Sequence, residues 1–359
     1  MPDWTRRELL KGVPASISVL SGCSQFPASW RDATPDYTWQ QNGEDQTVEL
    51  LVTQSTVYTI CYRCEFGTRA LNRQTGEQEW TFSAPRELFT GTATEQVVYV
   101  AGKDGVFALD ADTGEQYWHY PTEETVRTPP AVGTESVYIR SYDSTLHAVD
   151  TATGTRRWQT ALSVTGGTAP MAIEDGLVYV GSVGNVVYAF DSETGRKQWT
   201  FTVQEDIRLS STLASETLYV ASENIYALNP KTGTARWEYT PKSELGSLLL
   251  VAENRVYVGG RNIVALDASS GENQWGFRLP TEEGLLGFLG LVEKTLYGWN
   301  SRYLFAFDVD RAELQWRTED IAEYNFKLVT MYDETFYFVT HGEDIYALPL
   351  REAERVWGK

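Results

Sequence analysis

Short apolar segments alternate with polar turns along almost the whole chain. One unit shows the pattern completely: an apolar run at Val98–Val100 precedes a second run at Phe107–Asp110, and a polar turn then leads to Trp118. Each run has the length and the β-branched or aromatic content of a β-strand. In other copies a further run precedes the tyrosine-bearing one, as at Ala169–Ile173 and Ser247–Val251. The pattern therefore predicts four short strands in each unit.

The unit recurs eight times, at a spacing of about 40 residues. A tryptophan ends each copy, and an alanine stands ten positions before it. The tryptophans are Trp80, Trp118, Trp158, Trp199, Trp237, Trp275, Trp316 and Trp357. The alanines are Ala70, Ala108, Ala148, Ala189, Ala227, Ala265, Ala306 and Ala347. Four antiparallel strands per repeat are typical of a propeller blade, so we predict an all-β fold: an eight-bladed β-propeller of four-stranded antiparallel blades.

A tight turn joins the last two strands of each unit. Asp or Asn opens this turn by accepting hydrogen bonds from the backbone downstream, and a glycine in the left-handed conformation closes it. Six copies carry the glycine: Gly76, Gly114, Gly154, Gly195, Gly233 and Gly271. The last two copies carry Ala312 and Ala353 instead.

We interpret the eight tryptophans as blade-docking residues. A blade cannot bury its apolar faces alone, and full burial of a large ring contributes about 2–3 kcal/mol. The alanine leaves room for the ring. Trp39 lies at the repeat spacing before Trp80 but lacks the preceding motif. It either begins an extra outer strand that closes the ring on the last blade, or it is a lone aromatic residue of the tether.

The N-terminus has the layout of an export signal. Arg6 and Arg7 precede a short apolar run and resemble a twin-arginine signal. The run ends in Leu20–Cys23, which resembles a lipobox, so Cys23 would carry the lipid; the alternative is a chance cysteine in a leader. We predict a signal peptide at residues 1–22, a lipid-anchored tether at 23–46 and the propeller at 47–359. The protein would be extracytoplasmic, anchored to the outer face of the cell membrane.

The composition is strongly acidic, with 49 acidic and 30 basic residues and a net charge of −19. Only 8 of the basic residues are lysines. An acidic excess with scarce lysine resembles proteins of salt-loving archaea; the alternative is an ordinary acidic surface. No basic patch is available to neutralise phosphates, so nucleic acid is excluded as a partner. After the leader, no apolar stretch is long enough to span a membrane by itself.

The repeat, written Tyr-Val … Ala-Leu-Asp-x-x-Thr-Gly-x-x-x-Trp, resembles the quinoprotein (PQQ-like) repeat. The resemblance covers about Thr47–Lys359 and recurs in all eight copies. That family includes the propellers of alcohol and methanol dehydrogenases. It also includes the propeller lipoprotein of the bacterial outer-membrane protein assembly machinery. The resemblance thus implies either an enzyme or a binding scaffold.

For the enzyme, the resemblance implies PQQ near the axis, a calcium ion, a catalytic Asp, a Trp platform and, in many members, a disulfide between adjacent cysteines. This sequence has no adjacent cysteines and no long insertions that would build a substrate funnel. Trp299 is the one tryptophan inside a blade but outside the docking position. We therefore expect no catalytic residue, no metal site and no cofactor; PQQ with calcium would bind only if the dehydrogenase alternative holds.

Cys61 and Cys64 form a CxxC spacing where the first blade carries extra length between its middle strands. In an exported protein this spacing favours a small disulfide at a hairpin tip; two free thiols are the alternative. The three histidines, His119, His147 and His341, are scattered, and we expect His147 to be a packed, hydrogen-bonded core residue.

Taken together, these features favour a non-catalytic, monomeric scaffold that binds a protein or peptide partner through its rim loops or strand edges. The alternatives are a PQQ-dependent dehydrogenase acting on alcohols or sugars and a module that senses a small solute.

Overall fold

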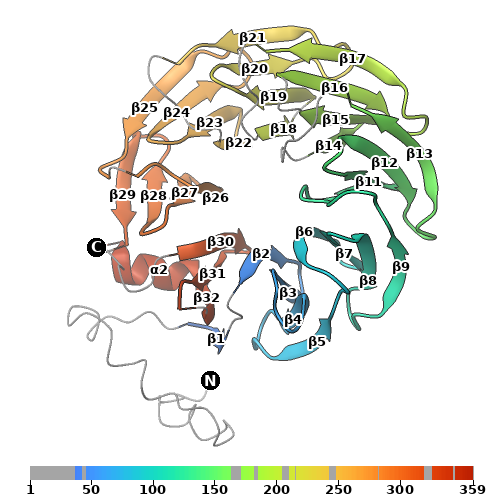
Figure 1. Ribbon diagram of the computed structural model, residues 1–359. Coiled ribbons are helices and arrows are strands. Elements are labelled where there is room, and N and C mark those ends of the chain that lie inside the picture. The colour runs from blue at the N-terminus through green and yellow to red at the C-terminus, as the bar shows by residue number, and fades with distance from the viewer. Residues whose placement is uncertain are drawn as a thin grey trace, which may run out of the picture. The chain divides into compact units, whose positions relative to one another are not determined.

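The chain forms eight separate four-stranded sheets, each with its strands antiparallel. The structure is a computed structural model that describes residues 37–42, 46–162, 171–181, 185–203, 210–214, 216–241, 248–281, 283–318, 326–342 and 344–358. These residues lie within the compact unit Asp36–Lys359. The sheets are arranged around a common axis, with strands such as β6 (Leu88–Ala93) innermost and strands such as β9 (Gln116–Tyr120) outermost (Figure 1). The predicted eight-bladed β-propeller is confirmed.

The first four blades follow one another along the chain. They are β2 (Thr47–Val52), β3 (Thr56–Cys61), β4 (Thr68–Asn72) and β5 (Gln78–Phe82); β6, β7 (Val97–Gly102), β8 (Gly105–Asp110) and β9; β10 (Ala131–Val132), β11 (Ser136–Arg140), β12 (Thr145–Asp150) and β13 (Arg156–Ala161); and β14 (Ala172–Glu174), β15 (Leu177–Gly181), β16 (Val186–Asp191) and β17 (Lys197–Thr202).

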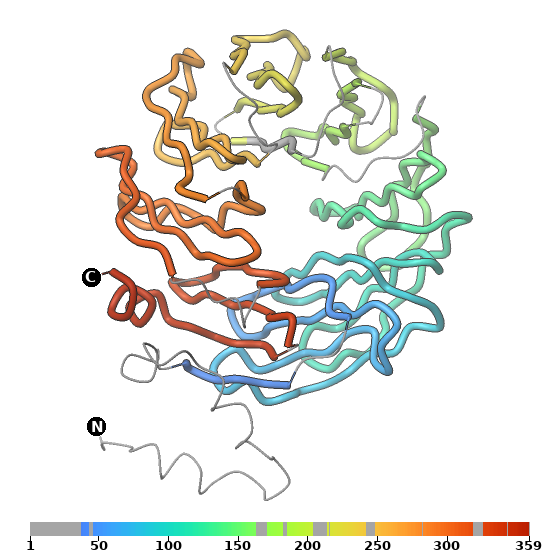
Figure 2. The backbone as a smooth tube through the Cα atoms, turned by 60° about the vertical axis from the view of Figure 1, so that its left-hand side comes forward, coloured from blue at the N-terminus to red at the C-terminus, as the bar shows by residue number. Residues whose placement is uncertain are grey.

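The last four blades complete the circle, and Figure 2 shows the last blade, in red, beside the first, in blue. They are β18 (Ser210–Ala214), β19 (Thr217–Ala221), β20 (Ile225–Leu228) and β21 (Ala235–Tyr239); β22 (Leu248–Ala252), β23 (Arg255–Gly259), β24 (Asn262–Asp267) and β25 (Asn273–Arg278); β26 (Gly287–Val292), β27 (Thr295–Trp299), β28 (Leu304–Asp308) and β29 (Glu313–Arg317); and β30 (Phe326–Tyr332), β31 (Thr335–Thr340), β32 (Asp344–Pro349) and β1 (Trp39–Asn42).

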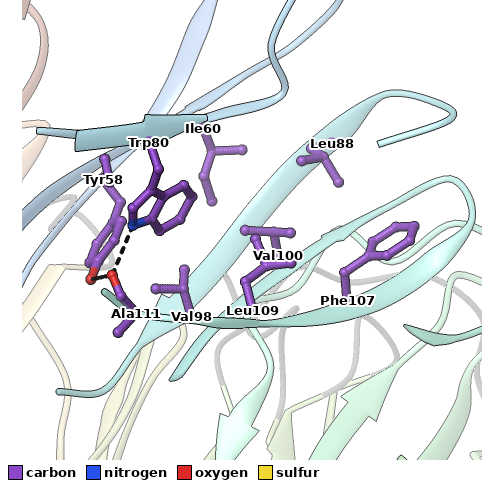
Figure 3. Packing of buried hydrophobic residues seen from close by; sticks show 10 residues of the cluster. Tyr58, Ile60, Trp80, Leu88, Val98, Val100, Phe107, Leu109 and Ala111 are labelled. Atoms are coloured by element: carbon purple, nitrogen blue, oxygen red, sulfur yellow. Dashed lines mark hydrogen bonds between the residues drawn. The ribbon is translucent and has the colours of Figure 1, made fainter. Parts of the chain in front are cut away.

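The core lies between neighbouring blades. At the junction of the first two, Tyr58 and Trp80 of one blade pack on Val98 and Leu109 of the next (Figure 3). The indole Nε1 of Trp80 donates a 3.0 Å hydrogen bond to the carbonyl of Ala111, which also accepts the Tyr58 hydroxyl at 3.1 Å. One carbonyl in the turn of the second blade therefore holds two rings of the first.

The same indole bond recurs around the ring. The bonds are Trp118 to Thr151 at 2.9 Å, Trp158 to Ser192 at 3.0 Å, Trp199 to Pro230 at 2.8 Å and Trp237 to Ala268 at 3.0 Å. Each acceptor is the residue that follows the Asp or Asn of the turn in the next blade. A blade therefore docks on a carbonyl whose position is set by its neighbour's turn.

Both the backbone conformation and the space beside the tryptophan ring require glycine in the turn. Gly114 has φ +72°, in the left-handed region that favours glycine, and a Cβ added there would lie 2.6 Å from the ring of Trp80. In the seventh blade the equivalent residue is Ala312, at φ 57°. The indole Nε1 of Trp275, which faces that turn, is buried and has no hydrogen-bond partner among the described residues. A methyl group in the glycine position thus coincides with the loss of the docking bond.

The ring is closed by a strand from the N-terminal side of the propeller. β1 pairs with β32 and aligns Trp39 with Ala347, just as Trp80 aligns with Ala70 in the first blade. Trp39 is buried and donates a 2.8 Å hydrogen bond from Nε1 to the carbonyl of Arg73. Of the two readings of Trp39, the outer strand is therefore correct. The propeller begins at Trp39 rather than at residue 47, so part of the segment expected to be tether belongs to the last blade.

Trp357 does not occupy an outer strand, which corrects the expectation that it docks a blade like the other seven tryptophans. It ends the helix α2 (Leu350–Trp357), and its ring lies 6.1 Å from that of Trp316. The local sequence explains the difference, because the last copy has Ala353 in place of the turn glycine and is rich in helix-forming residues. β1 already fills the outer position, and α2 instead covers the seventh blade, where Glu354 accepts the Tyr297 hydroxyl at 3.0 Å.

Candidate partner-binding surface

One rim of the propeller carries the hairpins between the second and third strands and the links from each blade to the next. The first of these hairpins contains the CxxC segment, between β3 and β4. Cys61 and Cys64 are in contact there, with their Cα atoms 5.8 Å apart, a separation compatible with a disulfide. Arg63, between them, has φ 60°. The turn therefore holds its tip residues in a conformation that non-glycine residues seldom adopt.

The tip residues extend into a row of four side chains from three consecutive blades. The guanidinium of Arg63 lies 4.8 Å from the ring centroid of Tyr62, and the Tyr62 and Phe89 rings are 5.4 Å apart at 30°. The guanidinium of Arg127 lies 4.3 Å from the Phe89 centroid. We call these four residues the arginine–aromatic ladder. Cation–π contacts of this kind hold each guanidinium over a ring.

A bulge aims Phe89 at its neighbours. The pairing of β6 with β7 shifts register between Leu88 and Thr90, which leaves Phe89 as the extra residue. A bulged residue is turned away from the regular alternation of the strand. Arg127 reaches Phe89 from the segment that enters the third blade, where Val126 bridges to Ser141. The ladder therefore depends on tertiary contacts between blades and on one local irregularity.

Charge is distributed unequally along the ladder. Glu87 accepts hydrogen bonds from Arg63 Nε at 3.3 Å and from Lys103 Nζ at 3.1 Å. Its own backbone amide, followed by Lys103 and Arg63, lowers the pKa of Glu87 to about 2. Arg127 is exposed and forms no ion pair with any residue that the structure describes. The ladder thus has one partly compensated guanidinium and one that is open to a ligand.

A buried carboxyl lies at the junction of the first two blades. Glu49 on β2 accepts a 2.7 Å hydrogen bond at Oε2 from the amide of Gly91 on β6. Burial raises the pKa of Glu49 to about 7, although the hydrogen bonds from Thr90 and Gly91 oppose the shift. The carboxyl joins two inner strands, and its hydrogen-bond partners among the described residues, Thr90 and Gly91, are not titratable, so we assign it a structural role.

His147 belongs to a buried polar chain. Its Nδ1 lies 3.0 Å from the Tyr120 hydroxyl, and its Nε2 lies 3.3 Å from the Ser141 hydroxyl, which donates to Asp143. Burial lowers the pKa of His147. The carboxylate contacts the serine rather than the imidazole, and Ser141 is only 2% exposed. This differs from the order of a nucleophilic triad, so His147 is the packed, hydrogen-bonded residue that the sequence predicts.

The described part of the chain does not bring together the features that the resemblance implies for a quinone site. Among the described residues, no group of three or more His, Cys, Asp or Glu side chains could hold a metal ion. Cys61 and Cys64 lie at a hairpin tip, not side by side in the chain. Trp299 packs on its own blade, since a Cβ added at Gly287 would lie 2.4 Å from its Nε1. The expectation of no catalytic residue, metal or cofactor remains a prediction.

Two surface hollows are also present. One, of about 450 Å³, is lined by Asp175, Asp191 and Lys231, and Lys231 pairs with Asp175 at 3.4 Å. The other, of about 560 Å³, is lined by Arg261 and Arg278 beside short backbone segments. Neither brings together aromatic and charged groups from several blades as the ladder does.

The export and anchoring residues Arg6, Arg7 and Cys23 lie outside the described residues, so their roles stay predictions. Within the described part of the chain, no helix has both the length and the apolar character that crossing a bilayer requires.

Fold and repeat together define the class, an eight-bladed propeller built from PQQ-like repeats. The chain belongs to the family described as "Outer membrane protein assembly factor BamB", whose model matches residues 67–181, 135–244, 183–300 and 221–359. The resemblance stated from the repeat is thereby confirmed at the level of the family. Function requires separate evidence, because one fold can host many functions.

Solved structures agree with this assignment of the fold. BamB from Moraxella catarrhalis is 16% identical, with a TM-score of 0.69 over 90% of this chain and 100% of that one. The computationally designed Ika8 protein is 14% identical, with a TM-score of 0.75 over 87% of this chain and 99% of that one. At such identities the similarity shows the fold alone.

A curated relative adds a partial match. The serine/threonine-protein kinase AfsK of Streptomyces griseus is 26% identical over 162 residues, which is 41% of this chain and 20% of the kinase. The match thus spans about a fifth of that protein's length.

Proposed function

We propose that this protein is a membrane-anchored, extracytoplasmic scaffold that binds a protein or peptide partner and catalyses no reaction. The observation that carries the proposal is the ladder, a surface of arginine and aromatic side chains held in place by three blades. Aromatic residues and arginine are enriched where proteins bind one another. Membership of a family described as an assembly factor supports the same role.

Anchoring would act through a lipid on Cys23, after export directed by Arg6 and Arg7. The tether would reach the propeller at β1, which forms the outer strand of the last blade. An acidic chain with a net charge of −19 suits a halophilic cell, where salt screens the repulsion between carboxylates.

The test is to purify the full-length protein from its own membrane and identify what accompanies it. The expected result is a stoichiometric protein partner that withstands stringent washing. Cys23→Ser provides the control for the anchor, since it should release the protein from the membrane without unfolding it. A protein purified alone, with no partner after mild crosslinking, would contradict the scaffold role.

The dehydrogenase alternative has its own test. Adding PQQ with calcium should leave the melting temperature unchanged, and the mixture should not reduce a dye in the presence of alcohols or sugars. A thermal shift together with dye reduction would establish the enzyme instead.

A further inference from the structure

We infer that the arginine–aromatic ladder is a docking site for an acidic, extended segment of a protein partner. This inference rests on the proposed scaffold role and specifies the chemistry of the partner. Its starting point is that two guanidinium groups already lie over rings, Arg63 over Tyr62 and Arg127 over Phe89. Since a guanidinium lies over one face of each ring, the free edges of the guanidiniums are the groups offered to a ligand.

Those edges favour carboxylates. A guanidinium presents a planar fork of N–H donors that matches a carboxylate in two parallel hydrogen bonds. Arg63 uses only its Nε toward Glu87, which leaves its two terminal nitrogens free of that contact. Stacking has already fixed the plane of each fork, so less side-chain freedom is lost on binding.

Unlike two arginines elsewhere on the propeller, Arg127 has no carboxylate paired with it in the described part of the chain. Arg157 pairs with Glu135 and Asp150, and Arg73 pairs with Asp333. In a chain with 49 acidic and 30 basic residues, carboxylates are plentiful as internal partners. Arg127 nevertheless forms no ion pair with a described residue and is exposed. A carboxylate of another molecule can therefore reach its guanidinium.

The shape of the ladder favours a peptide over a small anion. The four side chains form a row, with the two guanidiniums at its ends and the two rings between them. A small anion could use only one end. An extended chain can place carboxylates at both ends and apolar atoms along the ring edges. The exposed Tyr142 belongs to the same rim, since its amide donates a 2.9 Å bond to the carbonyl of Thr125 in the segment that carries Arg127.

The CxxC turn holds Tyr62 and Arg63 in place before a partner binds. Tyr62 and Arg63 lie between the two cysteines, and Arg63 has φ 60°. The Tyr62 amide is also bonded to the carbonyl of Gln46 at 2.9 Å. Residues held in rare backbone conformations cluster at binding sites. The first blade therefore presents a fixed Tyr–Arg pair to the partner.

Peptide binding tests the inference with a defined probe. A fluorescent synthetic peptide of alternating glutamate and alanine is titrated into the full-length protein, and the lysine–alanine peptide serves as the reversed-charge control. Arg63→Gln and Arg127→Gln are each expected to weaken binding about tenfold, since each removes one charge-assisted pair of hydrogen bonds to a glutamate. Phe89→Leu keeps both charges and is expected to weaken binding several-fold by removing the ring beneath Arg127.

The matched control is the double variant Arg261→Gln with Arg278→Gln, which removes two exposed arginines that line a separate hollow. It should bind the peptide as the wild type does. Equal losses in the control and in Arg63→Gln/Arg127→Gln would overturn the inference, because binding would then follow net charge alone. Failure of the wild type to bind the glutamate peptide would also overturn it. Melting temperatures establish that each variant is folded.

Purification from the membrane separates the two proposals. If a partner accompanies the wild type but is lost from Arg63→Gln/Arg127→Gln, both proposals are supported. If the partner stays with that variant, the scaffold role holds and the ladder is not the docking site. If the wild type binds the peptide but brings no partner, the ladder chemistry holds and the scaffold role fails.

Discussion

Replacing Gly114 with alanine tests how the blades are held together. Two costs arise at once. The residue has φ +72°, where an alanine costs about 1–2 kcal/mol. The new Cβ would also lie 2.6 Å from the Trp80 ring, so the ring must move. Its movement breaks the bonds that Trp80 and Tyr58 donate to the Ala111 carbonyl, each of which contributes about 1 kcal/mol.

A second glycine separates these two costs. Gly176 has φ +75°, but a Cβ added there would meet only the Ser192 hydroxyl, at 3.9 Å. Gly176→Ala therefore reports the backbone strain, together with any change in the unfolded chain, without displacing a tryptophan. We expect Gly114→Ala to lower the free energy of unfolding by about 2 kcal/mol more than Gly176→Ala does.

The assay is urea unfolding of the full-length protein, followed by tryptophan fluorescence and circular dichroism. The reverse change, Ala312→Gly, should raise the midpoint, because it relieves strain and lets Trp275 approach its carbonyl. Equal midpoints for Gly114→Ala and Gly176→Ala would refute the reasoning, since the indole would then tolerate a methyl group in the turn.

Three further predictions concern the ring, a titration and the CxxC turn. Trp39→Ala should destabilise the protein by about 3–5 kcal/mol and Trp357→Ala by less, as measured by urea midpoints, since Trp39 is buried and donates a bond across a blade junction, whereas Trp357 is half-buried at the end of α2. Glu49 has a folded-state pKa of about 7 against an ordinary 4.5, so the wild-type free energy of unfolding should fall as pH rises from 4.5 to 7. Glu49→Gln should abolish this fall. If the variant shows the same pH profile of stability as the wild type, Glu49 is not the group responsible. Cys61 and Cys64 should resist alkylation until reduced, as shown by intact mass; alkylation without reduction would indicate free thiols.

Much of the fold could be read from the sequence because each blade repeats the same local chemistry. The Asp–Gly turn and the alanine ten residues before each tryptophan mark strands that pair with their immediate neighbours in the chain. Short-range pairing of this kind leaves a clear periodic signal. The two copies that lack the glycine, at Ala312 and Ala353, also indicated where the turn pattern changes. They did not indicate which structure takes the place of the turn.

The ladder could not have been found in the same way. Its four members come from three repeats and occupy no shared motif position: Tyr62 and Arg63, Phe89, and Arg127. The unusual CxxC spacing was the only hint, and it pointed to a hairpin tip rather than to a surface. The bulge that turns Phe89 toward Tyr62 depends on how β6 pairs with β7, which the residue pattern does not specify.

The sequence by itself determined the number of blades, their four-stranded make-up and the tryptophan position from which five indoles bond to the next blade. Those features follow from interactions within one repeat or between adjacent repeats. Only the tertiary structure decided that Trp39, not Trp357, completes the last blade, and that four side chains from three blades form one surface. The physical reason is that closing a ring pairs the two ends of the propeller. The repeat spacing of Trp39 was visible in the sequence, but which strand it would pair with depends on contacts between residues far apart in the chain.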